Sequence, residues 1–408
     1  MRHLIRDILR CGMPQLGLDR RTFVMGALST AAAARAAQPE SQRKVRYGIV
    51  GAGNRSRGVH LPILRGYMPE VEITAICDIT PENLQHAIEF CPGAKGYSDY
   101  RRMLAEQQNL DAVLVVVPNF LYAEIAVAAL AAGKHVYVEK PMALSLADAD
   151  RMMQAAKQKD RALQVGQQFR YSEAHARMRE LIDQGAIGDV SYVFASLFRG
   201  DWNPRSWKYT DPATGKSTNW RMLTNTAGSS LLEDGIHELD VIHWVVNSDP
   251  VRIQAQGGNK VLRDRETIDN AGLLVEFANG ARLVFGYTVF TPRLPSARVL
   301  RVMGLKAEIT VEGTRTQAEV VIRPFEGAET RIPVASERPV LTATSWDWRG
   351  SPDPHTYRAH RAFLRSVQSG APVFADGKVG RDAIHISLAA ERSLRTGQTF
   401  RWEDEAEL

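Results

Sequence analysis

Residues 44–168 alternate short apolar runs with helical stretches, and this alternation restricts the fold more than any other feature of the sequence. Such a pattern is typical of strand–helix–strand units, which build a parallel sheet covered by helices. We expect strands at 45–50, 71–77, 95–97, 112–117, 135–138 and 162–168, with helices at 57–67, 81–90, 99–107, 120–132 and 146–159. The pattern predicts an open α/β domain over residues 43–168.

The pattern changes after residue 168, where several strands follow one another without intervening helices. We expect strands at 190–198, 273–277 and 282–287, with helices at 173–184, 229–246, 357–368 and 379–395. The pair Asn279-Gly280 is a strong signal for a two-residue type I′ hairpin. Strands grouped in this way favour an antiparallel sheet. We therefore predict a C-terminal α+β domain over residues 169–408 with a mostly antiparallel open sheet.

A glycine-rich segment, Gly51-Ala-Gly53-Asn54-Arg55-Ser56, ends the first strand and opens the first helix. Glycine permits the tight turn and the close approach of the backbone to a pyrophosphate, and the helix N-terminus supplies N–H donors. Ser56 replaces the Gly or Ala that is usual at the third position. Asp78 ends the second strand 22 residues after Ser56, where a carboxylate can bind the adenosine ribose hydroxyls. The segment and Asp78 predict a Rossmann-type dinucleotide site, and Asp78 favours NAD over NADP because it would repel a 2′-phosphate.

Two further groups of residues are candidates for catalysis. Lys140 follows Glu139 at the end of the fifth strand, the edge where open α/β sheets bind ligands. The helix over 229–246 carries Glu233, His237 and Asp240 at spacings that place them on one face. A histidine can take a hydroxyl proton near neutral pH. A solvated lysine and a structural histidine explain the same residues, so the sequence pattern alone leaves both interpretations open.

The order of these motifs resembles the glucose-fructose oxidoreductase / inositol dehydrogenase / rhizopine-catabolism (Gfo/Idh/MocA) family. The resemblance rests on the motifs Gly51-x-Gly53, Val117-Pro118-Asn119, Gly133-Lys134-His135-Val136-x-x-Glu139-Lys140-Pro141 and Gly235-Ile236-His237-x-x-Asp240. It implies that Pro118, Asn119, Glu139 and Lys140 border the cofactor. It also implies that Lys140 holds the reacting hydroxyl and that His237 is the general acid/base. Glu233 stands where inositol dehydrogenases have aspartate, so its catalytic role is less directly implied.

The substrate is expected to be a sugar or cyclitol. Arg170, Tyr171, Trp220, Arg221 and Asp240 are the candidate substrate contacts, because aromatic faces pack on sugar C–H groups and charged groups bind hydroxyls. Core packing or an oligomer contact is the competing interpretation for the aromatic-rich loop 199–226. The resemblance also implies a homodimer or homotetramer built on the open face of the antiparallel sheet.

The N-terminal 37 residues predict an export signal. Arg20-Arg21 precedes a mildly apolar stretch and the small-residue site Ala34-Arg35-Ala36, which is typical of a twin-arginine signal peptide. Residues 1–36 carry six arginines and two aspartates, so this segment holds four of the chain's five excess positive charges. The rest is close to neutral, and we expect neither nucleic-acid binding nor membrane insertion. The three cysteines and the remaining residues show no metal-ligand spacing.

We therefore expect an exported NAD-dependent oxidoreductase acting on a secondary hydroxyl, located in the periplasm or outside the cell. An exported enzyme has no surrounding nicotinamide pool, so the cofactor is expected to be tightly bound and regenerated in each cycle. Two alternatives stay open. One is a redox-neutral NAD-dependent glycosidase, which needs a second base such as Tyr171 or Tyr209. The other is a non-catalytic NAD or sugar sensor.

Overall fold

A computed structural model describes residues 43–200, 208–291, 297–314, 317–335 and 353–408, and Lys44–Leu408 form one unit. The predicted signal segment and Asp201, Trp202, Arg205 and Trp207 of the aromatic-rich loop lie outside the described residues. Among the residues described, no helix combines the length and the apolar character that crossing a membrane requires.

The N-terminal half contains a six-stranded parallel sheet, as predicted. Its strands are β1 (Val45–Val50), β2 (Val71–Cys77), β3 (Lys95–Tyr97), β4 (Ala112–Val115), β5 (His135–Val138) and β6 (Leu163–Val165). Their order is β3-β2-β1-β4-β5-β6, so the direction in which strands are added reverses between β1 and β4. Val50 pairs with Val115, which brings the carboxyl ends of these two strands together. A reversal of this kind is where open α/β sheets bind ligands.

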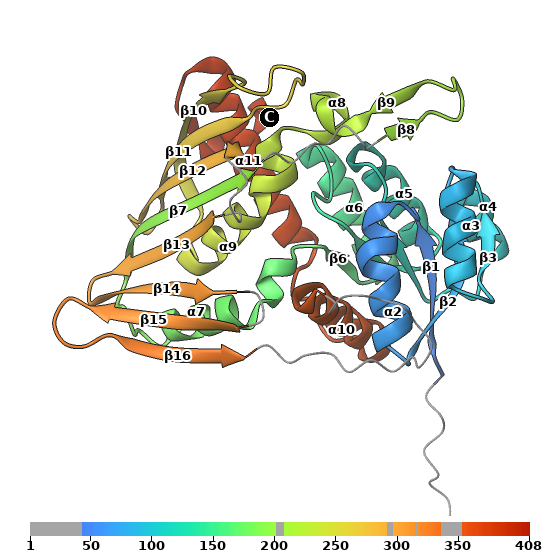
Figure 1. Ribbon diagram of the computed structural model, residues 1–408, viewed down its shortest axis with the longest axis horizontal. Coiled ribbons are helices and arrows are strands. Elements are labelled where there is room, and N and C mark those ends of the chain that lie inside the picture. The colour runs from blue at the N-terminus through green and yellow to red at the C-terminus, as the bar shows by residue number, and fades with distance from the viewer. Residues whose placement is uncertain (1–42, 201–207, 292–296, 315–316, 336–352) are drawn as a thin grey trace, which may run out of the picture. The chain divides into compact units, whose positions relative to one another are not determined.

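Helices from both halves of the sequence cover this sheet (Figure 1). The N-terminal ones are η1 (Ser56–His60), α2 (Leu61–Tyr67), α3 (Pro81–Phe90), α4 (Tyr100–Glu106), η2 (Asn119–Leu121), α5 (Tyr122–Ala131) and α6 (Leu146–Lys159). Two come from the end of the chain, α10 (Pro354–Ser369) and α11 (Gly377–Thr396). Phe363 of α10 packs edge-on against Tyr47 of β1, with ring centroids 6.2 Å apart. The chain therefore returns to the first domain after building the second.

The second half forms a nine-stranded sheet in the order β16-β15-β14-β13-β7-β12-β11-β10-β17. Its strands are β7 (Val190–Gly200), β10 (Pro250–Gly258), β11 (Asn270–Phe277), β12 (Arg282–Thr291), β13 (Ala297–Gly304), β14 (Ala307–Gly313), β15 (Gln317–Pro324), β16 (Thr330–Ala335) and β17 (Phe400–Arg401). Only the pair β7 and β12 is parallel among the pairings of its described strands. The prediction of a mostly antiparallel sheet is confirmed.

The remaining elements connect or cover this sheet. They are η3 (Gln168–Tyr171), α7 (Glu173–Asp183), β8 (Lys208–Thr210), β9 (Ser217–Asn219), η5 (Trp220–Met222), α8 (Thr224–Ala227), η6 (Leu231–Gly235), α9 (Ile236–Val246) and η7 (Trp402–Glu407). The helix predicted over 229–246 thus opens with the π-helical turn η6, and η1 at the glycine turn is also π-helical. Such turns are rare and occur often at functional sites.

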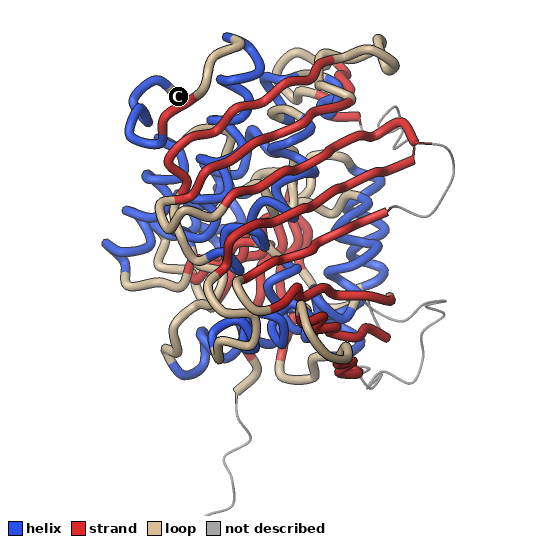
Figure 2. Tube along the Cα trace, turned by 90° about the vertical axis from the view of Figure 1, so that its left-hand side faces the viewer, coloured by secondary structure: helices blue, strands red, loops and turns tan. Residues whose placement is uncertain are grey.

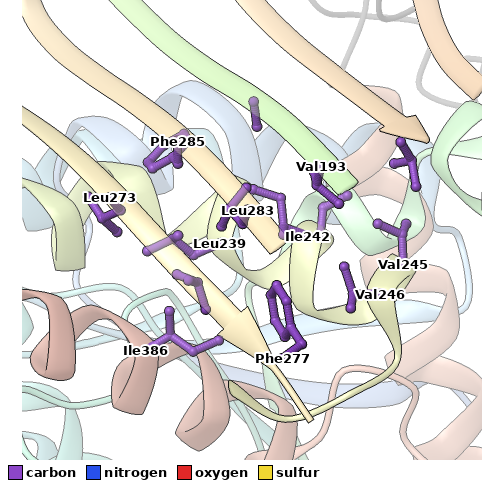
Figure 3. Packing of buried hydrophobic residues seen from close by; sticks show 14 of the residues in the cluster. Val193, Leu239, Ile242, Val245, Val246, Leu273, Phe277, Leu283, Phe285 and Ile386 are labelled. Carbon is purple, nitrogen blue, oxygen red and sulfur yellow. The ribbon is translucent and has the colours of Figure 1, made fainter. Parts of the chain in front are cut away.

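One face of the nine-stranded sheet is packed and the other is open (Figure 2). Leu239 and Ile242 of α9 and Ile386 of α11 pack on Leu283 and Phe285 of β12 (Figure 3). On the opposite face Tyr192, Phe194 and Phe198 of β7 are exposed. Burial of the inner side chains stabilises the domain by roughly 25 cal/mol per Å² of apolar surface removed from water.

The hairpin between β11 and β12 differs from the prediction. Only Gly280 has a positive φ, 87°, whereas a type I′ turn needs a positive φ at Asn279 too. Gly280 N–H donates to the carbonyl of Phe277, and Phe277 N–H donates to the carbonyl of Ala281. The loop therefore has three residues and ends on a left-handed glycine. Ala281 is fully buried, so the core fixes the longer register.

Candidate active site

The glycine turn lies where β1 ends beside β4. Gly51 has a φ of 98°, and a Cβ atom there would lie 2.0 Å from the carbonyl oxygen of Val116. No other residue fits this position. A Cβ atom at Gly53 would meet nothing within 4 Å, so the space beside the turn is open. The turn thus offers the room that a pyrophosphate needs at a helix N-terminus.

Asp78 lies beside this turn at the end of β2. Its Oδ2 accepts the Ala52 N–H at 2.6 Å, and its Oδ1 accepts the Thr80 N–H at 2.8 Å. The carboxylate is half-buried, so it keeps an accessible side for a ribose hydroxyl. The open glycine turn and this carboxylate fit the adenosine half of a nicotinamide dinucleotide.

The next three residues of the turn make contacts within the protein. Asn54 is exposed and accepts a hydrogen bond from Arg57 at 3.3 Å. Ser56 is fully buried, so its side chain packs inside the fold. Arg55 donates from Nε to Oε1 of Glu139 at 2.8 Å, and its Nη2 donates to Gln168 Oε1 at 3.1 Å. The structure therefore places the side chain of Arg55 between the glycine turn and the Glu139-Lys140 segment.

Glu139 is the centre of a buried network. Its Oε1 lies 2.9 Å from Nε2 of His60, in addition to the bond from Arg55, and its Oε2 accepts the backbone N–H of Lys140 at 3.0 Å. A Cβ at residue 166 would lie 2.9 Å from Oε2, so glycine is needed there. Burial alone would raise the pKa of Glu139, but the charge of Arg55 and the hydrogen bond with His60 hold it well below its usual range. The carboxylate is therefore ionised.

The network continues through a pair of histidines. His60 Nδ1 lies 2.8 Å from His360 Nε2, and both rings are fully buried. Burial lowers the pKa of both, so both are neutral. A neutral His60 that donates to Glu139 from Nε2 must accept at Nδ1 from His360. A directed chain of hydrogen bonds therefore runs from α10 to the residue before Lys140.

Lys140, Glu233 and Arg221 meet at the end of β5. Lys140 Nζ donates to the carbonyl oxygen of Glu233 and lies 3.5 Å from its Oε1. The Arg221 guanidinium donates to the same Oε1. The three side chains are 13%, 4% and 11% exposed, so these charges are largely removed from water. Three predicted residues, one just after β5 and the others in η6 and η5, thus form one cluster.

His237 lies one turn beyond Glu233. Its ring is buried and lies 4.9 Å from the ring of Phe169, centroid to centroid. Burial, followed by the charges of Lys140 and Arg298, holds the pKa of His237 well below its usual range. Its Nδ1 has no hydrogen-bond partner among the described residues. The histidine is therefore neutral and able to take a proton.

Arg170 and Asp240, both predicted substrate contacts, bind each other. Arg170 Nε lies 2.9 and 3.0 Å from the two carboxylate oxygens, and the side chains are 9% and 2% exposed. Burial raises the pKa of Asp240, although the charge of Arg170 opposes this. The pair links η3 to α9, and both carboxylate oxygens of Asp240 accept from the guanidinium of Arg170.

The other predicted residues lie around these groups. The hydroxyl of Tyr171 accepts the Ala375 N–H at 3.3 Å. Trp220 is buried with its ring 5.1 Å from the Arg221 guanidinium. Asn119 follows Pro118 after β4, and its Nδ2 donates to the carbonyl of Ala227 at 2.9 Å. This bond connects the β4 loop to α8.

The sequence assigned no role to several groups beside this cluster. Tyr122 is buried, and burial and the nearby charge of Glu139 raise its pKa well above the usual range. Arg199 pairs with Asp234, whose other oxygen lies 3.4 Å from the Tyr287 hydroxyl. Residue 199 and residue 234 belong to different elements, so no local spacing could reveal the pair. Within the described ranges no group of three or more His, Cys, Asp or Glu is placed to hold a metal ion.

The fold and the cluster define an oxidoreductase with a Rossmann domain that binds NAD(P). The family described as "Oxidoreductase family, NAD-binding Rossmann fold" matches residues 45–167, and "GFO/IDH/MocA C-terminal domain" matches residues 175–315. The chain belongs to the Gfo/Idh/MocA family of NAD(P)-dependent oxidoreductases.

Relatives of known activity support this assignment. The chain is 32% identical over 204 residues to inositol 2-dehydrogenase of Salmonella typhimurium. The matched residues make up 50% of this chain and 54% of the Salmonella enzyme. The match thus spans about half the length of that relative. Myo-inositol 2-dehydrogenase of Thermotoga maritima is 26% identical over 382 residues, covering 88% and 99%. The structure of the WlbA dehydrogenase from Bordetella pertussis with NADH and UDP-GlcNAcA shares the fold, with a TM-score of 0.73, 23% identity and coverage of 88% and 99%.

Proposed function

We propose that the protein is an NAD-dependent dehydrogenase that oxidises a secondary hydroxyl of a sugar or cyclitol. The observation that carries the proposal is the cluster at the end of β5, where Lys140 and Glu233 are in contact and a neutral His237 lies one helical turn away. Inositol dehydrogenases among the relatives support a cyclic polyol as substrate.

The residues of the cluster divide the chemistry among them. When bound, the nicotinamide supplies a hydride acceptor for the carbinol carbon. Lys140 donates a hydrogen bond to the substrate hydroxyl and favours its ionised form. His237 accepts the hydroxyl proton at a ring nitrogen, because burial and two nearby cations keep it neutral. Glu233 Oε2 has no partner among the described residues and can accept a second substrate hydroxyl.

The test is the absorbance of reduced nicotinamide formed from NAD with myo-inositol and a panel of hexoses. We expect turnover of at least one polyol, and loss of about two to four orders of magnitude in Lys140→Met and His237→Ala. Lys157→Met, an exposed lysine on α6, is the matched control. Loss of turnover in both active-site variants would exclude a non-catalytic sensor, and unchanged turnover in both would overturn the site assignment.

NAD is the proposed cofactor, with NADP disfavoured. The carboxylate of Asp78 already accepts two backbone N–H groups and faces the glycine turn, where it would repel a 2′-phosphate. Comparing kcat/KM for the two cofactors tests this directly.

Export with a retained cofactor is a further part of the proposal. It rests on the twin-arginine pattern at Arg20-Arg21 and on the absence of a nicotinamide pool outside the cytoplasm. The amount of NAD(H) left on the mature protein after gel filtration is the measurement. Near-stoichiometric retention is expected, and a cofactor-free protein that needs added NAD would contradict it. A redox-neutral glycosidase is the second function that a retained cofactor allows, and turnover of glycosides without net reduction distinguishes it.

Self-association is proposed through the open face of the nine-stranded sheet. Tyr192, Phe194 and Phe198 of β7 are 38%, 40% and 41% exposed on that face, and Leu274 of β11 is 55% exposed. Contiguous apolar side chains of this kind mark interaction surfaces. Sedimentation of the protein and of a Phe194→Glu variant tests the proposal, since a dimer or tetramer is expected only for the first.

A further inference from the structure

The turn η6, which carries Glu233, is held by one residue at its start, Ser229. The Oγ atom of Ser229 accepts the backbone N–H groups of Leu231 and Leu232 at 3.1 and 3.3 Å. Its carbonyl oxygen accepts the N–H of Glu233 at 2.9 Å. The first N–H groups of a helix have no partner inside the helix, so a side-chain oxygen at this place fixes the turn. Ser229 therefore sets the course of the backbone up to Glu233.

A carboxyl group from near the end of the chain holds Ser229 in its turn. The Ser229 hydroxyl donates to Oε1 of Glu391 on α11, 162 residues away, and the Ser229 backbone N–H bonds to the same carboxyl. A serine hydroxyl has one proton, so by donating it to Glu391 the oxygen keeps its lone pairs for Leu231 and Leu232. Burial raises the pKa of Glu391 to about 7, although the bonds from Ser229 and the charge of Arg395 oppose the rise. The chemistry proposed above gives this carboxyl no role.

The helix that carries Glu391 also lies against the segment after Lys140. A Cβ atom at Gly380 of α11 would lie 2.5 Å from Sδ of Met142, two residues after the lysine. Ile384 of α11 shares one buried cluster with Met142 and with Leu232 of η6. One helix thus packs on both sides of the reacting cluster, the strand end that presents Lys140 and the turn η6.

We propose that Glu391 is a positioning residue for the dehydrogenase site: its carboxyl anchors Ser229 and thereby holds Glu233 against Lys140. The inference rests on the proposed function of that cluster. Lys140 Nζ donates to the carbonyl oxygen of Glu233, so a shift of η6 displaces the lysine together with the carboxylate that accepts a substrate hydroxyl. The site therefore requires a hydrogen-bond acceptor at residue 391 and not only a side chain of the right size.

Glu391→Met and Glu391→Gln form a matched test, because both keep the length of the side chain and only glutamine keeps an oxygen that accepts from Ser229. Amide hydrogen exchange over Leu231–Glu233, followed by mass spectrometry on the full chain, measures the anchor without turnover. We expect exchange there to accelerate about tenfold or more in Glu391→Met and in Ser229→Ala, and to stay within about threefold of wild type in Glu391→Gln. Lys378→Met, an exposed lysine on the same helix, is the control and keeps wild-type exchange. Wild-type exchange in Glu391→Met would overturn the anchor.

Turnover tests the link to the reaction. The constants kcat and KM are measured at about pH 8, above the pKa of Glu391. We expect Glu391→Met to lower kcat about tenfold or more, with KM for NAD changed less than about twofold because the glycine turn is untouched. Glu391→Gln should restore kcat to within about threefold of wild type.

The two measurements separate failure of this inference from failure of the proposed function. Equal kcat in Glu391→Met and Glu391→Gln would show that residue 391 only fills space, and would refute the positioning role. If exchange over η6 responds to Glu391→Met while the wild type reduces NAD with no polyol, the anchor stands and the proposed dehydrogenase fails.

Discussion

The replacement Glu139→Gln tests how Lys140, the proposed catalytic lysine, is held. In the native protein one carboxylate satisfies three donors, since Oε1 receives Arg55 and His60 and Oε2 receives the Lys140 N–H. A glutamine presents one oxygen and one NH₂ group. Whichever way the amide is turned, an N–H donor must face the NH₂, and at least one hydrogen bond is lost together with the charge that pairs with Arg55.

The expected cost follows from the burial of the pair. Removing one partner of a buried ion pair costs about 3–5 kcal/mol. The side chain of Arg55 is 31% exposed and Glu139 is 3% exposed, so water compensates part of the loss. We expect Glu139→Gln to lower the free energy of unfolding by about 3 kcal/mol, near the lower end of that range.

The cost also has a defined pH dependence. The pKa of Glu139 in the folded protein is well below its ordinary value, so the folded state binds fewer protons than the unfolded one. The stabilisation that the ionised Glu139 provides is therefore complete above its pKa of about 4.3 in the unfolded chain. It is lost as the pH falls through the lower pKa of Glu139 in the folded protein. The difference between wild type and Glu139→Gln should be constant from neutral pH to about pH 5 and should shrink only in more acidic solution.

Urea unfolding followed by circular dichroism measures both effects. Glu124→Gln is the matched control, because Glu124 pairs with Arg101 on the surface with side chains 54% and 65% exposed. An exposed pair contributes at most about 1 kcal/mol. If Glu139→Gln costs no more than Glu124→Gln, the buried network does not hold the Lys140 segment.

Three further changes test other parts of the site. Gly51→Ala should lower NADH affinity at least roughly tenfold in a fluorescence titration, because its Cβ would lie 2.0 Å from the carbonyl oxygen of Val116; wild-type affinity would contradict the turn's role. Asp78→Ala should raise the NADP-to-NAD ratio of kcat/KM, and an unchanged ratio would remove Asp78 from cofactor selection. His237 must be neutral to accept a proton and its pKa is lowered, so the acid limb of kcat/KM should lie below pH 6.5. Arg298→Gln removes one of the cations that lower this pKa and should move the limb to higher pH, whereas a fixed limb would show that another group titrates.

Local pattern was sufficient to predict the architecture and part of the site. The strands at 45–50, 71–77 and 135–138 occur as expected, because each is a buried apolar run bounded by turn residues. Lys140, Glu233 and Arg221 meet because a strand end and two short helical turns converge at one edge of the parallel sheet. A family resemblance in the motifs indicated two of these three residues as catalytic.

The remaining features depend on tertiary contacts that local spacing does not encode. The partner of Arg55 is 84 residues away, and that of His60 is 300 residues away on a helix that returns from the second domain. Arg55 has the position of a cofactor contact in the sequence, and its guanidinium binds the buried carboxylate of Glu139. Arg170 and Asp240 likewise neutralise each other inside the fold. At Asn279-Gly280 the buried Ala281 selected a longer loop than the dipeptide alone favours.

We propose that Lys140 and His237 activate a polyol hydroxyl for hydride transfer from its carbon to NAD. The most direct measurement is the formation of reduced nicotinamide in a single turnover of the purified protein with NAD and a polyol substrate. We predict a fast phase in the wild type that is lost in both Lys140→Met and His237→Ala, while both variants still bind NADH. Reduction at the wild-type rate in either variant would contradict the role proposed for the replaced residue.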